Sequence, residues 1–323
     1  MFINNQPLGE INNNSFLPTD IFICSSSFEN RCKAIPESID PANIVRALIL
    51  KNVNIGEVQE NADYLSNLFT DKAHFINVST QSCIETADNI ADAIVPSISN
   101  TSLSSVVIDI TTFTHESLLV LINILNKFKH QKLSITLLYT SAIEYSTDKK
   151  AIEDKWLSSG VSGIRTVLGY SGDVKPLNKT HLIMFVGYES SRSSKIIELI
   201  EPSIISLGYG EAGTSTNSNH EEASSYFHTV VEEMAKKHAK VYPFPFSCSN
   251  PYDVKKKIIE QCSIDKNANI VVAPMNTKLS TIGVGLAALE LGTIQLCYAP
   301  AIQYNTDHYS KPGNTFSAFK LNF

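Results

Sequence analysis

Short apolar runs alternate along the chain with longer segments in which apolar residues recur every three or four positions. The runs predict strands and the periodic segments predict helices. In the first half the predicted strands are 21–24, 45–50, 74–78, 106–110 and 133–139, and the predicted helices are 61–69, 83–94 and 116–128. Wholly apolar runs are typical of strands covered on both faces, and strands that alternate with helices indicate a parallel sheet. We therefore expect a Rossmann-like first half.

The second half repeats this alternation. Its predicted strands are 182–186, 204–207, 241–244, 270–273 and 294–298, and its predicted helices are 193–200, 221–238, 251–262 and 280–291. Phe319, Leu321 and Phe323 alternate with polar residues and predict a terminal strand. The segment 208–219, rich in Gly, Ser, Thr and Asn, is interpreted either as a mobile lid or as an exposed loop. The expected fold class is α/β, with two tandem Rossmann-like halves, each a mostly parallel sheet flanked by helices.

Identical residues at identical spacing indicate that the two halves are related by internal duplication. Ile135, Leu137, Tyr139, Ala142, Ile143 and Tyr145 return 159 residues later as Ile294, Leu296, Tyr298, Ala301, Ile302 and Tyr304. Phe28, Glu29, Arg31 and Pro41 correspond likewise to Tyr188, Glu189, Arg192 and Pro202, with one extra residue between the Glu and the Arg of the second copy. Segment 106–114 falls on 270–278. Three landmarks in the same order favour a tandem repeat over coincidence.

The length of 323 residues suits two domains of ordinary size. The repeat places them at 20–146 and 181–323. Residues 1–19 are polar and contain two prolines, which predicts an extended or loosely packed N-terminal arm. Residues 147–180 interrupt the strand and helix pattern with charges and glycines, and we interpret them as a connecting segment packed between the domains.

Composition excludes several classes of protein. The net charge is −6 and the Lys and Arg residues are scattered, which disfavours direct binding of nucleic acid. The six cysteines show no CxxC spacing, and they are expected to be reduced residues of a cytoplasmic protein. No eighteen apolar residues run together, so we expect no membrane span. The sequence suggests no metal site and no cofactor.

Chemistry in an open parallel sheet is expected in the loops that follow the carboxyl ends of the strands. In both halves the loop after the first strand carries small or hydroxyl residues, then an aromatic residue, a Glu and an Arg. The first-half candidates are Ser25, Ser26, Ser27, Phe28, Glu29 and Arg31, and the second-half candidates are Gly187, Tyr188, Glu189 and Arg192. The Arg suits capture of a phosphate and the aromatic ring suits stacking on a base. The structural alternative is that Glu29 and Glu189 lie at the positive end of a helix while each Arg pairs with a carboxylate, for example across the interface between the halves.

A second pair of loops follows the fourth predicted strand of each half. The candidates are Asp109, Thr111, Thr112 and Thr114 in the first half, and Asn276, Thr277 and Lys278 in the second. Hydroxyls, an amide and a cation at a helix start suit phosphate or ribose, although helix caps use the same residues. Ala273 replaces Asp109 and Lys278 replaces Thr114 across the repeat, which favours one asymmetric ligand site, or one functional half, over two equal sites.

The motif DITTFT at 109–114, a strand that ends in Asp followed by threonines and a helix, resembles the second ligand loop of CRISPR-associated Rossmann-fold (CARF) sensor domains. The serine-rich turn at 25–27 resembles their first ligand loop. After Thr111 the chain continues with Thr112, Phe113, Thr114 and His115 where the family usually has Gly-Gly-Thr-Lys. The resemblance implies recognition of a nucleotide second messenger in prokaryotic antiviral defence.

The sequence favours a binding protein over an enzyme, because no nucleophile elbow, phosphate-binding Walker loop or zinc motif is present. We expect a sensor or adaptor that binds a nucleotide or another phosphorylated small molecule and acts through a protein effector or complex subunits, with homo-oligomerisation a further expectation. Two alternatives stay open: a nucleotide or glycosidic-bond hydrolase or transferase that uses Glu29 or Glu189, and a purely structural subunit.

Overall fold

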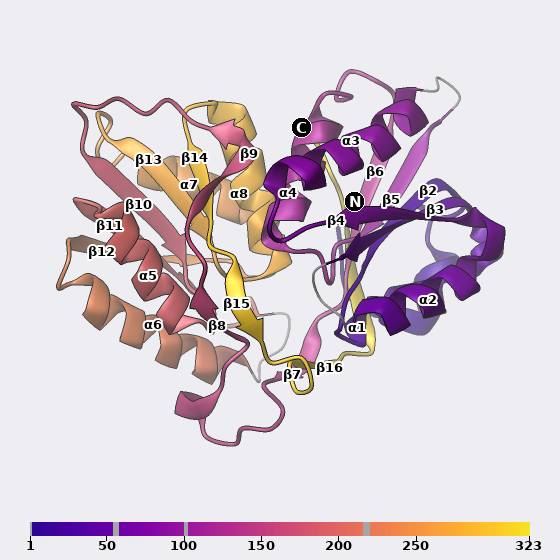
Figure 1. Cartoon of the computed structure of the whole chain (residues 1–323), viewed down its shortest axis with the longest axis horizontal. Coiled ribbons are helices and arrows are strands. Elements are labelled where there is room, and N and C mark those ends of the chain that lie inside the picture. Colours follow the sequence, from indigo (N-terminus) through magenta and orange to yellow (C-terminus); the bar gives the residue numbers. More distant parts are fainter. Residues whose placement is uncertain (1, 54–57, 100–102, 216–219) are drawn as a thin grey trace. The chain divides into compact units, whose positions relative to one another are not determined.

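The computed structural model describes residues 2–53, 58–99, 103–215 and 220–323, which form two compact units (Figure 1). Unit 1 comprises Met1–Glu144 and Ser310–Phe323, and unit 2 comprises Tyr145–Tyr309. Each unit contains a sheet of mostly parallel strands flanked by helices. The predicted fold class of two tandem Rossmann-like α/β halves is thereby confirmed. Of the predicted loop 208–219, residues 216–219 lie outside the described residues.

The unit 1 sheet has the strand order β1-β17-β6-β5-β2-β3-β4. Its strands are β1 (Phe2–Pro7), β2 (Thr19–Ser26), β3 (Ile44–Asn52), β4 (Ala73–Val78), β5 (Ser105–Asp109), β6 (Ser134–Tyr139) and β17 (Thr315–Lys320). The strands from β6 to β4 run parallel, whereas β17 is antiparallel to both β6 and β1. The helices are α1 (Arg31–Ser38), α2 (Val58–Phe69), α3 (Cys83–Ser99) and α4 (His115–Asn126). Short strands β7 (Ala142–Tyr145) and β16 (Ser310–Pro312) pair with each other.

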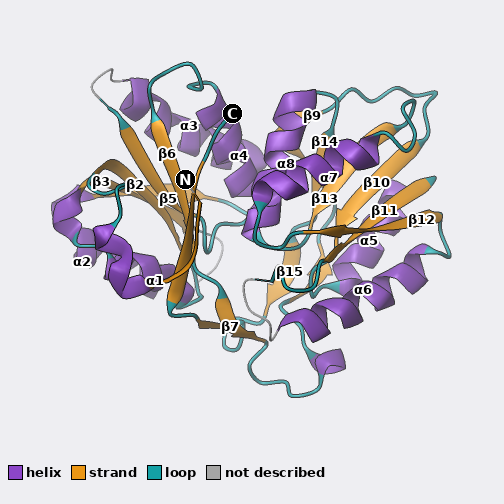
Figure 2. Cartoon of the chain, turned by 180° about the vertical axis from the view of Figure 1, so that it is seen from behind, coloured by secondary structure: helices purple, strands orange, loops and turns teal. Residues whose placement is uncertain are grey.

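The unit 2 sheet has the order β12-β11-β10-β13-β14-β9, with β9 antiparallel to β14 at one edge. Its strands are β9 (Arg165–Ser171), β10 (Thr180–Phe185), β11 (Ile204–Gly210), β12 (Lys240–Phe246), β13 (Asn269–Pro274) and β14 (Gln295–Tyr298). The helices are α5 (Ser190–Ile200), α6 (Glu221–Ala235), α7 (Pro251–Cys262) and α8 (Lys278–Leu291), with α5 and α6 on one face and α7 and α8 on the other (Figure 2). Strands β8 (Ser158–Val161) and β15 (Ala301–Tyr304) form a separate antiparallel pair.

Consecutive side chains of a strand point to opposite faces of the sheet, so the apolar strands supply core residues on both faces. In unit 1, Phe22 of β2 packs against Phe69 of α2 with ring centroids 5.6 Å apart. In unit 2, Phe185 of β10 meets Phe246 of β12 at 4.8 Å. Helix α8 is buried on almost every side, and a Cβ at Gly283 would lie 2.4 Å from the Pro251 carbonyl oxygen. A glycine at this position therefore allows α8 to approach the start of α7 closely.

The structure differs from the prediction at the N-terminal arm. Residues 2–7 form β1, an edge strand of the unit 1 sheet, and Leu8–Asn13 form a 3₁₀ helix whose Ile11 is completely buried. Ile11 and Phe16 belong to the same apolar cluster as Phe22 and Ile35. The arm was predicted to be loose because its few apolar residues are scattered among asparagines. Those few side chains nevertheless fill one face of the sheet beside α1.

The division of the chain also differs from the predicted ranges. Residues Ser310–Phe323, predicted as part of the second domain, belong to unit 1, where β17 pairs with β6. The predicted connecting segment 147–180 contributes β8 and β9 to unit 2. Strands β8 and β9 are short, antiparallel and rich in small and polar residues, so their sequence pattern is weak. A terminal strand was predicted, but its pairing with the distant β6 was not.

Candidate functional site: the strand-end loops

The two candidate loops of each unit lie side by side, because the strands that precede them are neighbours. Strand β2 pairs in parallel with β5, and β10 pairs in parallel with β13. At this position in each sheet, successive strands of the chain are added on opposite sides. This is the topological switch point at which open α/β sheets bind ligands.

The serines of the first unit 1 loop hold the shape of the turn. Ser26 Oγ donates to the Leu50 carbonyl oxygen at 3.1 Å, and Ser27 Oγ accepts from the Glu29 amide at 3.2 Å. Asn61 of α2 donates its side-chain amide to the Ser27 carbonyl oxygen at 2.6 Å. Ser25, Ser26 and Ser27 are all buried, whereas Phe28 is half-buried. The loop is therefore fixed by its own polar groups.

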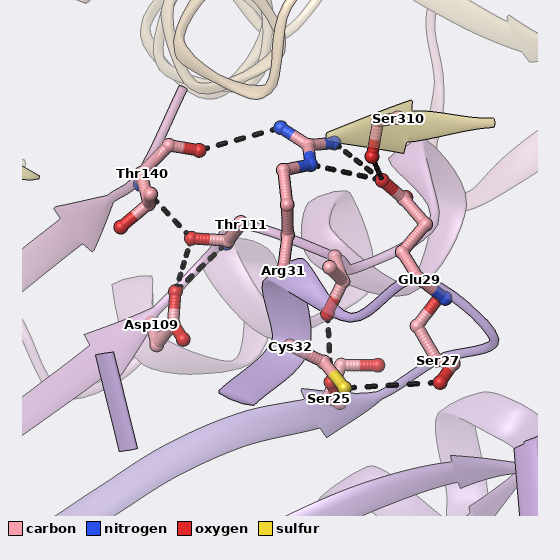
Figure 3. Close-up of polar contacts among 10 residues, drawn as sticks. Ser25, Ser27, Glu29, Arg31, Cys32, Asp109, Thr111, Thr140 and Ser310 are labelled. Carbon is pink, nitrogen blue, oxygen red and sulfur yellow. Dashed lines mark hydrogen bonds and ion pairs between the residues drawn. The ribbon is translucent and has the colours of Figure 1, made fainter. Parts of the chain in front are cut away.

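Glu29 and Arg31 form a buried ion pair within this loop (Figure 3). Glu29 Oε2 accepts from Arg31 Nε at 2.9 Å and lies 2.8 Å from Arg31 Nη2, and it also accepts from Ser310 Oγ at 2.6 Å. Arg31 Nη1 donates to the Thr140 carbonyl oxygen at 3.3 Å. The sequence left an ion pair of each Arg with an unnamed carboxylate as an alternative to ligand binding, and the structure shows that the partner of Arg31 is Glu29 of its own loop. Arg31 is 4% exposed, and its guanidinium supports the loop.

The second unit 1 loop is organised around a buried carboxyl group. Asp109 Oδ1 accepts from the Thr111 amide at 3.0 Å and from the Thr111 hydroxyl, which in turn accepts from the Thr140 amide at 3.0 Å. Burial raises the pKa of Asp109 to about 7, against the opposite influence of the Thr111 hydrogen bonds and of the Arg31 charge. Loop 109–114 is therefore tied to the end of β6.

The remaining threonines of this loop connect it to its surroundings. Thr112 Oγ1 donates to the Ser25 carbonyl oxygen at 2.7 Å, which links the two loops of unit 1 directly. Thr114 is the N-cap of α4, and its Oγ1 accepts from the Ser117 amide at 3.1 Å. Both side chains are half-buried.

Unit 2 repeats the buried ion pair. Arg192 Nη1 donates to Glu189 Oε2, Arg192 Nη2 donates to the Ala299 carbonyl oxygen at 2.6 Å, and Ser158 Oγ donates to Glu189 Oε1. Although burial lowers it, the pKa of Arg192 is raised above its ordinary value by the Glu189 carboxylate and nearby tyrosines. Ser158 takes the position that Ser310 has in unit 1, and Ala299 takes the position of Thr140.

The second unit 2 loop touches the first. A Cβ at Gly187 would lie 2.0 Å from the Met275 carbonyl oxygen, so only glycine fits where the loops meet. Asn276 donates its side-chain amide to the Val186 carbonyl oxygen, and Thr277 is the N-cap of α8. Lys278, the first residue of α8, is half-buried. Unlike unit 1, this loop places a cation at the helix start.

A cluster of aromatic residues surrounds Tyr188. Its ring centroid lies 5.5 Å from that of Tyr145, 5.4 Å from Phe227 and 6.3 Å from His220, and Tyr145 also lies 6.4 Å from Tyr309. Burial raises the pKa of Tyr188 far above its ordinary value. Of these residues, Tyr188 alone was predicted as a site residue. Its neighbours come from distant segments of the sequence, and Tyr145 was noted because the repeat returns it as Tyr304.

A cavity of about 600 Å³ lies on the α5 side of the unit 2 sheet, away from these loops. It is lined by residues of β9, β10, β13 and β14 and by the end of α5, among them Thr166, Asn269 and Gln295. Three of the polar residues that line it are held by hydrogen bonds: Gln295 donates to Thr166 Oγ1 at 2.6 Å, and Asn269 donates to the Lys175 carbonyl oxygen at 2.9 Å.

The described part of the chain shows neither a metal-binding cluster nor a membrane-spanning helix. Among residues 2–53, 58–99, 103–215 and 220–323, no group of three or more His, Cys, Asp or Glu side chains is placed to hold a metal ion. Within the same residues, no helix has both the length and the apolar character needed to span a membrane.

No protein-family model and no curated protein matches the chain. Among solved structures, the chain is similar to a type III CRISPR defence DNA nuclease activated by cyclic oligoadenylate, with 8% identity and a TM-score of 0.51 over 90% of this chain and 67% of the nuclease. It also aligns with the UDP-GlcNAc 2-epimerase of Neisseria meningitidis, at 7% identity over 79% of this chain and 77% of the epimerase, with a TM-score of 0.23. The likeness to the nuclease is one of fold.

Proposed function

We propose that the protein binds a nucleotide at the strand-end loops and acts as a sensor or adaptor through a partner protein. The observation that carries this proposal is the pair of adjoining loops at the switch point of each sheet, held rigid by buried polar groups. Pre-ordered loops bind a ligand without a large loss of conformational entropy. The fold likeness to a nuclease activated by cyclic oligoadenylate supports an adenine nucleotide and a role in prokaryotic antiviral defence.

Within this proposal the loops of unit 2 make the stronger contacts with the ligand. Lys278 brings a positive charge to the N-terminus of α8, where backbone amides also favour a phosphate. Tyr188 is half-buried on the adjoining loop and offers a ring for stacking on a base. In unit 1 the corresponding positions are Thr114 and Phe28, and the buried Asp109 adds a carboxyl group. Arg31 and Arg192 act in this scheme by holding the loops.

The alternative of a hydrolase or transferase that uses Glu29 or Glu189 finds less support. A general acid or base must reach a proton on the substrate. Glu29 Oε2 instead accepts hydrogen bonds from Arg31 and Ser310, and Glu189 is held by Arg192 and Ser158. Both carboxylates are nearly buried.

Isothermal titration of the full chain against cyclic oligoadenylates, linear oligoadenylates, ATP and AMP tests the proposal. We expect binding of at least one adenine nucleotide, and Lys278→Ala should weaken it by about tenfold or more, because a hydrogen bond to a charged group is lost. Lys266→Ala, which removes an exposed charge before β13, is the matched control and should bind as the unmodified protein does. Absence of binding to the whole panel would contradict the proposal.

A further inference from the structure

The buried ion pairs of the two units use the same chemical groups. In unit 1 the Arg31 guanidinium bonds to Glu29 and to the carbonyl oxygen of Thr140, and in unit 2 the Arg192 guanidinium bonds to Glu189 and to that of Ala299. Thr140 and Ala299 are separated by the same 159 residues that relate the sequence repeats. The contacts therefore extend the duplication from sequence to geometry.

The serine that bonds to each Glu comes from a different place in the chain in the two units. Ser310, which bonds to Glu29, lies on β16 near the C-terminus, whereas Ser158, which bonds to Glu189, lies on β8 and precedes the unit 2 sheet. Strand β16 continues into β17, which pairs with β6, and β8 continues into β9, which pairs with β14. The two-strand segments β16–β17 and β8–β9 are thus equivalent.

Each two-strand segment pairs with strands of the other repeat. The segment β8–β9 follows the first repeat along the chain, but β9 pairs with β14 and β8 with β15 of the second. The segment β16–β17 follows the second repeat, but β17 pairs with β6 and β16 with β7 of the first. The segment interpreted from sequence as a connecting spacer therefore has a counterpart at the C-terminus. Exchange of identical elements between copies is the arrangement found in domain-swapped dimers.

We propose that the two repeats of this chain exchange their C-terminal two-strand segments, and that Ser158 and Ser310 are positioning residues through which each segment holds the first strand-end loop of the other repeat. Each serine donates to a buried carboxylate that is already paired with an Arg. Hydrogen bonds to ionised groups are about twice as strong as neutral ones. The loop that carries Glu29 is thereby fastened by the second repeat, and the loop that carries Glu189 by the first.

Amide hydrogen exchange on the full chain tests the two serines without any ligand, so its result is independent of the proposed function. Ser158→Ala should speed exchange at 187–192 by about tenfold and leave 25–31 unchanged, and Ser310→Ala should do the reverse. Ser159→Ala is the matched control, because consecutive side chains of a strand project from opposite faces and Ser159 directly follows Ser158 in β8. Equal exchange in all variants, or a change in both loops from either serine, would overturn the positioning role.

Engineered disulfides test the exchange itself. Ser159 of β8 lies opposite Gln303 of β15, and the repeat makes Glu144 the equivalent of Gln303. A protease site is inserted between Pro176 and Leu177, in an exposed segment that separates the repeats. Cleavage places positions 144 and 159 in the first fragment and position 303 in the second. The disulfide of S159C/Q303C should therefore keep the two fragments joined on a non-reducing denaturing gel. The variant S159C/E144C should show no new disulfide by mass spectrometry.

The opposite pattern, a disulfide in S159C/E144C and separate fragments in S159C/Q303C, would overturn the exchange. A band at twice the chain mass in uncut S159C/Q303C would overturn exchange within one chain in favour of exchange between two chains.

Discussion

At the scale of single residues, the most consequential groups are charges that the fold buries. Arg31 and Arg192 are 4% and 6% exposed, and each is held by one Glu and one backbone carbonyl group. Sequence spacing identified both Glu–Arg pairs but left their role open, because a ligand contact and an ion pair require the same residue types. Their burial and partners support the ion pair, in which each Arg is bound to the Glu of its own loop.

Removal of one partner of a buried ion pair should therefore lower the stability of the protein. Arg192→Met leaves Glu189 buried without its cation, and we expect the free energy of unfolding to fall by about 3 to 5 kcal/mol. Urea denaturation followed by circular dichroism measures this. Lys195→Met breaks the exposed pair with Glu198 on the same helix and should change the value by no more than about 1 kcal/mol. A similar small loss for Arg192→Met would show that the pair is not structural.

The buried carboxyl group of Asp109 predicts a pH dependence of stability. Its pKa is raised from 3.8 to about 7, so the folded protein binds a proton that the unfolded chain releases between those values. Stability from this group is fully present below pH 3.8 and is lost as the pH rises towards 7. Asp109→Asn should remove that decline, on the order of 4 kcal/mol across the range. Urea denaturation of both proteins from about pH 4 to 8 measures it, and parallel curves would contradict the raised pKa.

At the scale of elements, prediction succeeded where burial imposes a pattern. The parallel strands and most helices were predicted, because strands such as β5 and β13 have wholly apolar centres, VVI in β5 and IVVA in β13. A helix was expected after Ser27, but no bounds were predicted for α1, because half of its sequence RCKAIPES is polar and it contains Pro36. The partners Ser158 and Ser310 of the candidate site could not be predicted either, since nothing local in a small polar strand indicates which distant loop it contacts.

The packing of the N-terminal arm is also expected to contribute to the stability of the protein. Ile11 is completely buried against the sheet, so Ile11→Ala should lower the free energy of unfolding by about 2 to 5 kcal/mol through lost burial and the cavity left behind. Ile84→Ala, at a side chain that is 61% exposed, is the control of the same chemistry and should have little effect. Equal urea midpoints for the two variants would show that the arm contributes no packing.

At the scale of the whole molecule, the parallel strands of the two sheets follow the same order, β6-β5-β2-β3-β4 and β14-β13-β10-β11-β12, and we propose that each sheet receives one antiparallel strand from the other repeat. This connectivity explains why domain boundaries drawn from the repeat were displaced at the C-terminus: the sequence repeat follows the chain, whereas the units follow the sheets. The fold likeness to a CRISPR defence nuclease covers 90% of this chain, which spans both units. Ligand binding at the strand ends is the function that we propose for this architecture.

Hydrogen exchange with and without a saturating adenine nucleotide from the titration panel tests that central claim most directly, because it reports where the ligand lies. We predict slower exchange at 187–192 and 276–281, with the remaining described segments of unit 2 little changed. Protection confined to 163–166 and 295–297, at the cavity beside β9 and β14, would place the ligand elsewhere and contradict the assignment of the strand-end loops.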